Sequence, residues 1–280
     1  MKKISKNQIK EFNDNGFLII KDIIDISKLK KINSIYKKIF NGHYQTEIVP
    51  DKVKWKPNRD SLSIPRSLCN VWKSNKNIAQ VVCSKTISSI AGQLMNWNSV
   101  RLNQDSLIWL VPKAGCVNFH QDNPYQDWHT PGNVITCWIP VTKTNINSGS
   151  IEYLVGSNKK KISKRLKNFY SKSNYRSIIN KYLKKDESKI KTMSLDAGSV
   201  VFHHGNTWHG SGYNQTSKDR ISISIHFMDG KSKFHPKIKS PFFNHYKKFD
   251  SLAMEESFFP ITWSKKKNKI RFIDKYLIKS

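Results

Sequence analysis

The sequence predicts a mainly β fold, a barrel or sandwich of short strands with helices packed on its outside. Between residues 100 and 228, short apolar segments alternate with turn residues such as glycine, proline and asparagine, a pattern typical of strands. Before residue 100, apolar residues recur instead at the spacing of an amphipathic helix. We therefore expect the helices first in the chain and the sheets after them.

Residues 7–40 predict a helix, a strand and a second helix. The first helix is expected to end near Gly16, because glycine suits the left-handed conformation that closes many helices. The apolar run over residues 17–20 then predicts a strand. A longer amphipathic helix follows, and Ser27 is its expected N-cap, since a serine hydroxyl can accept a hydrogen bond from the first turn.

The rest of the N-terminal flank is expected to be a loop followed by helix. Residues 41–76 are polar and contain three prolines, so we expect a long loop there. Residues 77–97 return to helical spacing of their apolar side chains. Residues 1–99 are therefore expected to form a mostly helical flank.

The core, residues 100–228, is expected to contain a series of short strands joined by turns. Their expected ranges are 100–111, 116–120, 133–142, 150–154, 191–195, 199–203, 207–211 and 220–228. A basic insertion at 158–190 interrupts them, with 12 basic residues, two acidic ones and helical spacing. We expect this insertion to be a solvated lid, because long insertions in compact domains are commonly functional or disordered.

The C-terminal extension, residues 229–280, is expected to pack on this core. It is basic but rich in aromatic residues, namely Phe242, Phe243, Phe258, Phe259, Trp263 and Phe272. With 280 residues and 38% hydrophobic content, the chain can bury a large core. We expect residues 1–280 to form a single domain, whose oligomeric state the sequence leaves open.

Composition predicts a cytoplasmic protein. No apolar run reaches the roughly 18 residues that a membrane-spanning helix requires. The lysine-rich N-terminus lacks the apolar stretch of a secretory signal. The four cysteines have neither C-x-x-C spacing nor the density of a disulfide framework, which is typical of a reduced compartment.

The net charge of +29 invites a role in nucleic-acid binding, but the kind of basic residue argues against it. Only 7 of the 49 basic residues are arginine, the residue that phosphate clamps and base readers favour for its planar fork. Abundant lysine, asparagine and isoleucine indicate instead an AT-rich coding sequence. We therefore expect a solvated basic surface, with a mild preference for anionic substrates still open.

A His-x-Asp pair and one distant histidine form the most informative pattern in the chain. His120 and Asp122 lie at the end of a predicted strand, and His209 follows 89 residues after His120. Two histidines and one carboxylate are the facial triad that binds Fe(II) and leaves open positions for a co-substrate and O₂. A His-x-Asp pair alone occurs often by chance, so its surroundings decide its meaning.

The surroundings of His209 favour this metal site. Two apolar strands flank a glycine-rich turn, and His209 stands directly before Gly210. Eleven residues after His209, Arg220 opens an alternating strand. A guanidinium at this place can hold a carboxylate of a co-substrate in a bidentate pair.

Four segments follow one another along the chain: NDNGFLIIKDII, HQDNPYQDW, ITCWIPVTKTNINSGSIEYLVGS and WHGSGYN, with Arg220 after them. Together they resemble the phytanoyl-CoA dioxygenase family of Fe(II)- and 2-oxoglutarate-dependent oxygenases. The resemblance covers most of the chain and is specific because several ordered motifs match at once. It implies a double-stranded β-helix, the jelly-roll arrangement also found in cupins.

The resemblance also implies roles for individual residues. His120, Asp122 and His209 would be the iron ligands, and these three residues the catalytic set. Arg220 and Ser211 would bind the far carboxylate of 2-oxoglutarate. Apart from the resemblance, Trp138 lies on a predicted strand across from the site and is expected either to stack near the co-substrate or to belong to the core. Related halogenases have a small residue in place of the ligand carboxylate, so Asp122 favours hydroxylation.

A polar and aromatic group of residues near the pair is expected to bind the substrate. Gln104 and Asn118 lie on strands leading to it, and Tyr125, Gln126 and Trp128 follow it; simple loop packing is the alternative. The other histidines carry less weight. His203 and His204 are adjacent on a strand and point to opposite faces, so neither is an expected ligand. His129 is expected at the surface, with a place at the mouth of the substrate site as the alternative, and no spacing argument applies to His226.

The sequence thus predicts an Fe(II)-, 2-oxoglutarate- and O₂-dependent hydroxylase that acts on a small polar metabolite and releases succinate and CO₂. An acyl-CoA-type substrate is the alternative within the family. A binding module without catalysis, a cupin-type hydrolase or isomerase, and a basic nucleic-acid-binding protein are alternatives from other classes. Arg220 argues against the first two, since neither needs to bind 2-oxoglutarate.

Overall fold

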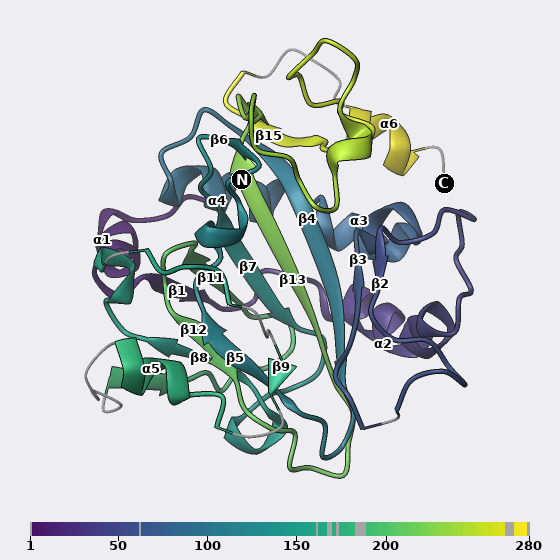
Figure 1. Cartoon of the computed structure of the whole chain (residues 1–280), viewed down its shortest axis with the longest axis vertical. Coiled ribbons are helices and arrows are strands. Elements are labelled where there is room, and N and C mark those ends of the chain that lie inside the picture. The colour runs from purple at the N-terminus through teal and green to yellow at the C-terminus, as the bar shows by residue number, and fades with distance from the viewer. Residues whose placement is uncertain are drawn as a thin grey trace.

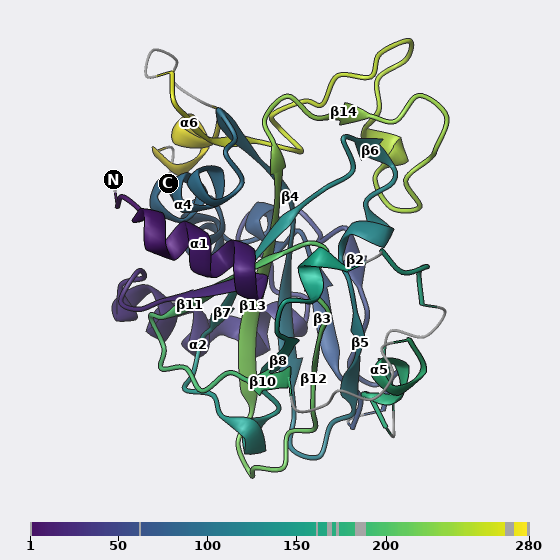
Figure 2. The same cartoon turned by 90° about the vertical axis from the view of Figure 1, so that its left-hand side faces the viewer.

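Helices, a large sheet and a small sheet form three successive layers (Figures 1 and 2). The computed structural model describes residues 2–61, 63–160, 162–166, 170–171, 174–182, 189–266 and 272–278. In Figure 2 most of the helices lie on the left and the large sheet in the middle, while the small sheet lies lower and further right, next to the helix Ser177–Tyr182. The fold is mainly β with flanking helices, as the sequence predicts.

The two main sheets are antiparallel. The large sheet has the order β1 (Phe17–Ile20), β11 (Val200–His204), β7 (Ile135–Pro140), β13 (Arg220–Asp229), β4 (Ser99–Leu110), β3 (Arg66–Cys69) and β2 (Lys52–Val53), and β15 (Ile261–Ser264) also pairs with β4. The small sheet has the order β10 (Ile190–Thr192), β8 (Ile151–Leu154), β12 (His209–Ser211), β5 (Cys116–His120) and β9 (Tyr170–Ser171). A separate pair joins β14 (Lys233–Phe234) to β6 (His129–Thr130).

Most of the helices come early in the sequence, before residue 95. The helices are α1 (Lys6–Asn15), α2 (Ile26–Phe40), α3 (Lys76–Val82), α4 (Lys85–Leu94), α5 (Ser177–Tyr182) and α6 (Phe272–Ile278). Short 3-10 turns are η1 (Val71–Lys73), η2 (Asn123–Tyr125), η3 (Ile146–Ser148), η4 (Ser157–Lys159) and η6 (Asn244–Tyr246). In the part of the chain that the structure describes, no helix has the length and apolar character to cross a membrane.

Alternation along β13 separates the main core from the interior between the sheets. Ile221, Ile223 and Ile225 join the large apolar cluster that the N-terminal helices cover. The residues between them, from Arg220 to His226, point to the opposite face, because successive strand residues alternate. One strand thus contributes both to the core and to the space between the two sheets.

Most predicted elements are confirmed, with three corrections. Gly16 does close α1, with φ of +83°. The N-cap of α2, however, is Asp25, whose Oδ1 accepts a hydrogen bond from the Ser27 amide at 2.8 Å, so Ser27 was wrong by two positions. Residues 77–97 form two helices, since Ser84 caps a new one.

The third correction concerns the expected loop over residues 41–76. It contains β2, β3 and η1, and β3 extends the large sheet by pairing with β4. These strands are too short and too polar for their sequence to predict them. They form because the exposed edge of β4 offers backbone partners, which only the folded sheet provides.

The described part of the C-terminal extension lies against the upper end of the large sheet (Figure 1). Phe234, Phe243 and Phe259 form a buried aromatic cluster with Trp128. Phe242, in contrast, is 46% exposed. Through this cluster, the loop that follows the His-x-Asp pair packs against the C-terminal extension.

Candidate active site

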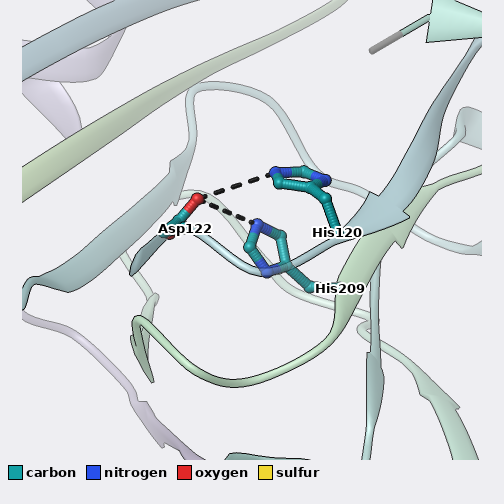
Figure 3. Close-up of side chains that lie close together, drawn as sticks. All are labelled: His120, Asp122 and His209. Atoms are coloured by element: carbon teal, nitrogen blue, oxygen red, sulfur yellow. Dashed lines mark ion pairs between the residues drawn. The ribbon is translucent and has the colours of Figure 1, made fainter. Parts of the chain in front are cut away.

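Strand pairing in the small sheet brings the three expected metal ligands together. His120 is the last residue of β5, and Asp122 follows it just before η2. In the β5–β12 pair, His209 lies directly opposite His120 despite their distance in sequence. Figure 3 shows the two imidazole rings side by side, both facing the carboxylate of Asp122.

The geometry of these three side chains fits a metal ion. Their donor atoms lie within 4.8 Å of one another, and all three residues are buried. The Nε2 atoms of His120 and His209 are each 3.6 Å from Oδ1 of Asp122 (Figure 3). Two neutral imidazoles and one carboxylate are the donor set that Fe(II) oxygenases use.

Backbone carbonyls orient both histidine rings. Nδ1 of His120 lies 2.8 Å from the carbonyl of Asn118, and Nδ1 of His209 lies 2.9 Å from that of Thr207. A carbonyl can only accept, so each Nδ1 carries the proton and each Nε2 presents a lone pair to the metal position. Burial, assisted by neighbouring His120 and His203, holds the pKa of His209 well below its ordinary value and keeps the ring neutral.

The second oxygen of Asp122 has its own set of partners. Thr136 donates a hydrogen bond to Oδ2 at 2.6 Å, and Nε2 of His203 lies 3.1 Å from the same atom. Nε2 of His226 is 3.5 Å away. Burial raises the pKa of the Asp122 carboxyl, but the surrounding histidines outweigh burial, so the pKa lies well below its ordinary value and the group is ionised.

Sequence reasoning missed the contribution of His203 and His226. His203 and His204 do point to opposite faces of β11, and His203 is the one that faces Asp122. The hydroxyl group of Tyr153 lies 2.8 Å from Nδ1 of His203. His226 stands six residues after Arg220 on the same strand, so period-two alternation puts both on one face. That alternation was visible in the sequence and would have identified His226.

A cavity of about 600 Å³ connects the triad with the expected co-substrate residues. Arg220, Ser211 and Trp138 all line it. Arg220 is buried, and its guanidinium donates to Ser222 Oγ at 2.6 Å and to the carbonyl of Gly149 at 2.8 Å. These contacts orient the buried guanidinium of Arg220 at the cavity wall. A carboxylate bound in the cavity would pair with this cation, and such pairing makes the burial of both charges favourable.

The expected substrate residues are only partly at this cavity. Gln104, Tyr125, Gln126 and Trp128 line it, whereas Asn118 does not and contributes its carbonyl to His120. Gln126 also accepts a hydrogen bond from the buried Asn103 at 2.9 Å, so part of its side chain serves packing.

The expectation for His129 was wrong. His129 is only 1% exposed, and its Nε2 lies 3.3 Å from Asn103 Nδ2. Its position in a polar loop suggested the surface, but His129 on β6 pairs with Phe234 on β14, and the neighbouring Trp128 packs against Phe243 and Phe259 of the C-terminal extension. Only contacts between distant segments reveal this burial.

Part of the basic insertion forms a wall of the cavity. Arg165 and Leu166 line it, and the Leu166 amide donates to the Tyr125 hydroxyl at 2.9 Å. Arg165 donates to the Pro124 carbonyl at 2.8 Å and pairs with Asp127. Residues 161, 167–169, 172–173 and 183–188 of the expected lid lie outside the described residues.

A model of the phytanoyl-CoA dioxygenase family matches residues 12–222 of the chain. The chain belongs to this family. It is an Fe(II)- and 2-oxoglutarate-dependent dioxygenase, which confirms the predicted reaction class and co-substrate.

Individual relatives of this dioxygenase are distant. A probable alpha-ketoglutarate-dependent hypophosphite dioxygenase of Stutzerimonas stutzeri is 24% identical over 226 residues, 78% of this chain and 76% of the relative. The peroxisomal phytanoyl-CoA dioxygenase of Homo sapiens is 20% identical over 239 residues, 80% of this chain and 68% of the relative.

The solved structure of SnoK, a non-heme alpha-ketoglutarate-dependent carbocyclase from nogalamycin biosynthesis, has the same fold. Its TM-score is 0.70 at 17% identity, and the match covers 92% of this chain and 96% of SnoK. At that identity the likeness supports the fold alone, and it confirms the double-stranded β-helix for this dioxygenase.

Proposed function

We propose that this dioxygenase hydroxylates a small polar metabolite, with release of succinate and CO₂. The observation that carries the proposal is one cavity of about 600 Å³ lined by His120, Asp122 and His209 together with Arg220. That volume lies within the range of small-molecule sites, about 300–1,000 Å³. The wall beyond the triad mixes polar and aromatic side chains, including Gln104, Ser106 and Tyr125.

Each group of residues in the site has a separate role in the proposed reaction. His120, Asp122 and His209 would hold Fe(II), which with 2-oxoglutarate supplies the oxidising chemistry when both are bound. Arg220 and Ser211 would bind the far carboxylate of 2-oxoglutarate beside Trp138. The buried position of the triad keeps bulk water from the reacting atoms. With Fe(II) bound, the carboxylate of Asp122 would serve as the ligand that related halogenases lack, which favours hydroxylation.

The site assignment is tested first without O₂. Anaerobic addition of Fe(II) and 2-oxoglutarate should give the weak visible charge-transfer band of an iron–keto acid chelate. We expect His209→Ala to abolish the band, because the metal loses one of three ligands. The matched control is His43→Ala, which removes an exposed histidine on the loop after α2. A band that survives in His209→Ala at wild-type strength would reject the ligand assignment.

The substrate class is tested next, in air. A library of small polar metabolites, with acyl-CoA thioesters as a separate arm, should be screened for succinate release above the uncoupled background. We expect polar metabolites to stimulate succinate release, and mass spectrometry should then detect a product heavier by one oxygen atom. Stimulation by acyl-CoA thioesters alone would establish the alternative substrate class, and a product of unchanged oxygen content would exclude hydroxylation.

A further inference from the structure

We propose that the substrate carries an anionic group, a phosphonate, phosphate, sulfate or carboxylate, which Lys52 and Lys54 bind at the edge of the large sheet. This inference rests on the proposed function of the cavity. It specifies the chemical class of the substrate and the direction in which the substrate lies in the cavity.

Strand register puts these lysines at the end of the cavity remote from the co-substrate residues. A row of directly paired residues crosses the inner face of the large sheet: Trp138, Ser224, Ser106, Cys69 and Lys52. All five line the cavity. Adjacent strands lie about 4.8 Å apart, so β2 is about 14 Å from β13. An anion at Lys52 and the carbon that reacts beside the triad therefore belong to opposite ends of one substrate.

Lys54 extends the cationic edge in the same direction. It stands two residues after Lys52, so both side chains lie on the same face and both line the cavity. Its backbone amide donates to the Ser67 carbonyl at 3.0 Å, which continues the β2–β3 pairing beyond Lys52. Two ammonium groups at this spacing can share the oxygens of one anion.

The carboxylates of the cavity wall are engaged by other groups. Asp51 accepts hydrogen bonds from Asn70 and Tyr246, each at 2.6 Å, and forms a buried ion pair with Lys73. Asp122 belongs to the metal site. Among the described residues, no carboxylate lies within ion-pair distance of the Lys52 ammonium, which instead lies 4.0 Å from the ring centroid of Phe242.

The lysines also differ from a solvated basic surface. Both are half-buried, and burial lowers the pKa of each; for Lys52 the neighbouring charge of Lys54 lowers it further. A bound anion would offset both effects, because an opposite charge favours the protonated ammonium. Arg165, a further cation in the cavity wall, pairs with Asp127 and donates to the Pro124 carbonyl. The geometry therefore assigns the anion to the two lysines.

Binding to the anaerobic enzyme loaded with Fe(II) and 2-oxoglutarate tests this inference. The probes are alkyl phosphonates, sulfates and carboxylates of increasing chain length, with alcohols and ammonium compounds of the same length, measured by calorimetry. We expect one anionic series to bind at least about tenfold more tightly than its matched alcohols, since charge-assisted hydrogen bonds are worth this much. Comparison of the three anionic series identifies the anion.

Variants assign the effect to the lysines. The double substitution Lys52→Gln with Lys54→Gln should weaken anion binding about tenfold or more, while Lys52→Arg with Lys54→Arg should retain it. The control, Lys28→Gln with Lys31→Gln, removes the same charge from exposed positions of α2 and should leave binding unchanged. Circular dichroism and thermal melting check that each variant is folded.

Each outcome bears on one hypothesis. The inference is overturned if anions bind no better than alcohols or ammonium compounds, if no probe binds, or if the glutamine pair binds anions like wild type. It is supported by loss in the glutamine pair with retention in the arginine pair. Failure of the charge-transfer band, or of succinate release with any substrate, would instead reject the proposed function.

Discussion

The two carboxylate oxygens of Asp122 have different partners, and this difference defines the site at the scale of single residues. Oδ1 faces the Nε2 atoms of the two ligand histidines, while Oδ2 accepts a hydrogen bond from Thr136. A ligand carboxylate held at its outer oxygen keeps one orientation before the metal arrives. Thr136, on β7 of the large sheet, therefore positions a ligand that lies two residues beyond the end of β5 in the small sheet.

We expect Thr136→Val to weaken Fe(II) binding about 10- to 100-fold, because Asp122 loses the hydrogen bond that orients it. Anaerobic Fe(II) titration measures this affinity. Thr136→Ser keeps the hydroxyl group and should therefore retain most of the Fe(II) affinity. If valine and serine variants bind iron equally well, the hydrogen bond has no positioning role.

Arg220 should act on the co-substrate and not on the metal. Arg220→Ala removes the buried cation that would pair with 2-oxoglutarate, so we expect the KM for 2-oxoglutarate to rise about tenfold or more. Iron affinity should stay close to wild type, because Arg220 is not among the ligand atoms that converge at the triad. Equal loss of iron and co-substrate binding would indicate misfolding instead of a lost contact.

Among the secondary-structure elements, the pairing of β5 with β12 decides whether a metal site forms at all. His209 and His120 face each other only in the observed register, which shifts between His209 and Ser211. Gly210 lies at this shift, and there is no room for a side chain there. A Cβ at position 210 would come within 2.6 Å of the Phe119 ring and 2.8 Å of the Val117 carbonyl oxygen.

Gly210→Ala should therefore displace β12 from β5. We expect iron affinity to fall by about tenfold or more and the free energy of unfolding by about 1–3 kcal/mol, the usual cost of overpacking. Urea unfolding and anaerobic Fe(II) titration measure the two effects. Wild-type values for both would mean that the strands tolerate the methyl group without moving.

At the scale of the whole molecule, buried His129 makes stability depend on pH. Burial lowers the pKa of His129 to about 4 from its ordinary 6.5. Below about pH 6.5 the unfolded chain binds a proton that the folded protein does not bind until about pH 4, so stability falls as the pH drops through this interval. The full effect is about 3 kcal/mol.

Comparison with His129→Gln isolates this contribution. We expect the free energy of unfolding of wild type to fall more steeply between about pH 7 and pH 4 than that of the variant, because glutamine binds no proton. Urea denaturation at several pH values measures both curves. Parallel curves over this interval would show that His129 does not couple folding to protonation.

Local patterns in the sequence were enough for the mainly β fold class, most strands and the end of α1 at Gly16, and the reaction class followed from the resemblance to the phytanoyl-CoA dioxygenase family. Period-two alternation, turn residues and the His-x-Asp spacing act over a few residues, so the chain displays them directly. The short strands β2 and β3 escaped prediction because their pairing depends on the edge of β4. The burial of His129 escaped it because the C-terminal region, distant in sequence, covers that loop.

The amino-acid sequence by itself determined which side chains can bind iron and a carboxylate, since spacing and residue type determine donor chemistry. The tertiary structure alone decided what surrounds them. His203, Thr136 and His226 meet Asp122, and Lys52 faces the same cavity as Trp138, because strands far apart in the chain pair in one register. Register is set by the packing of whole sheets, so these neighbours exist only in the folded molecule.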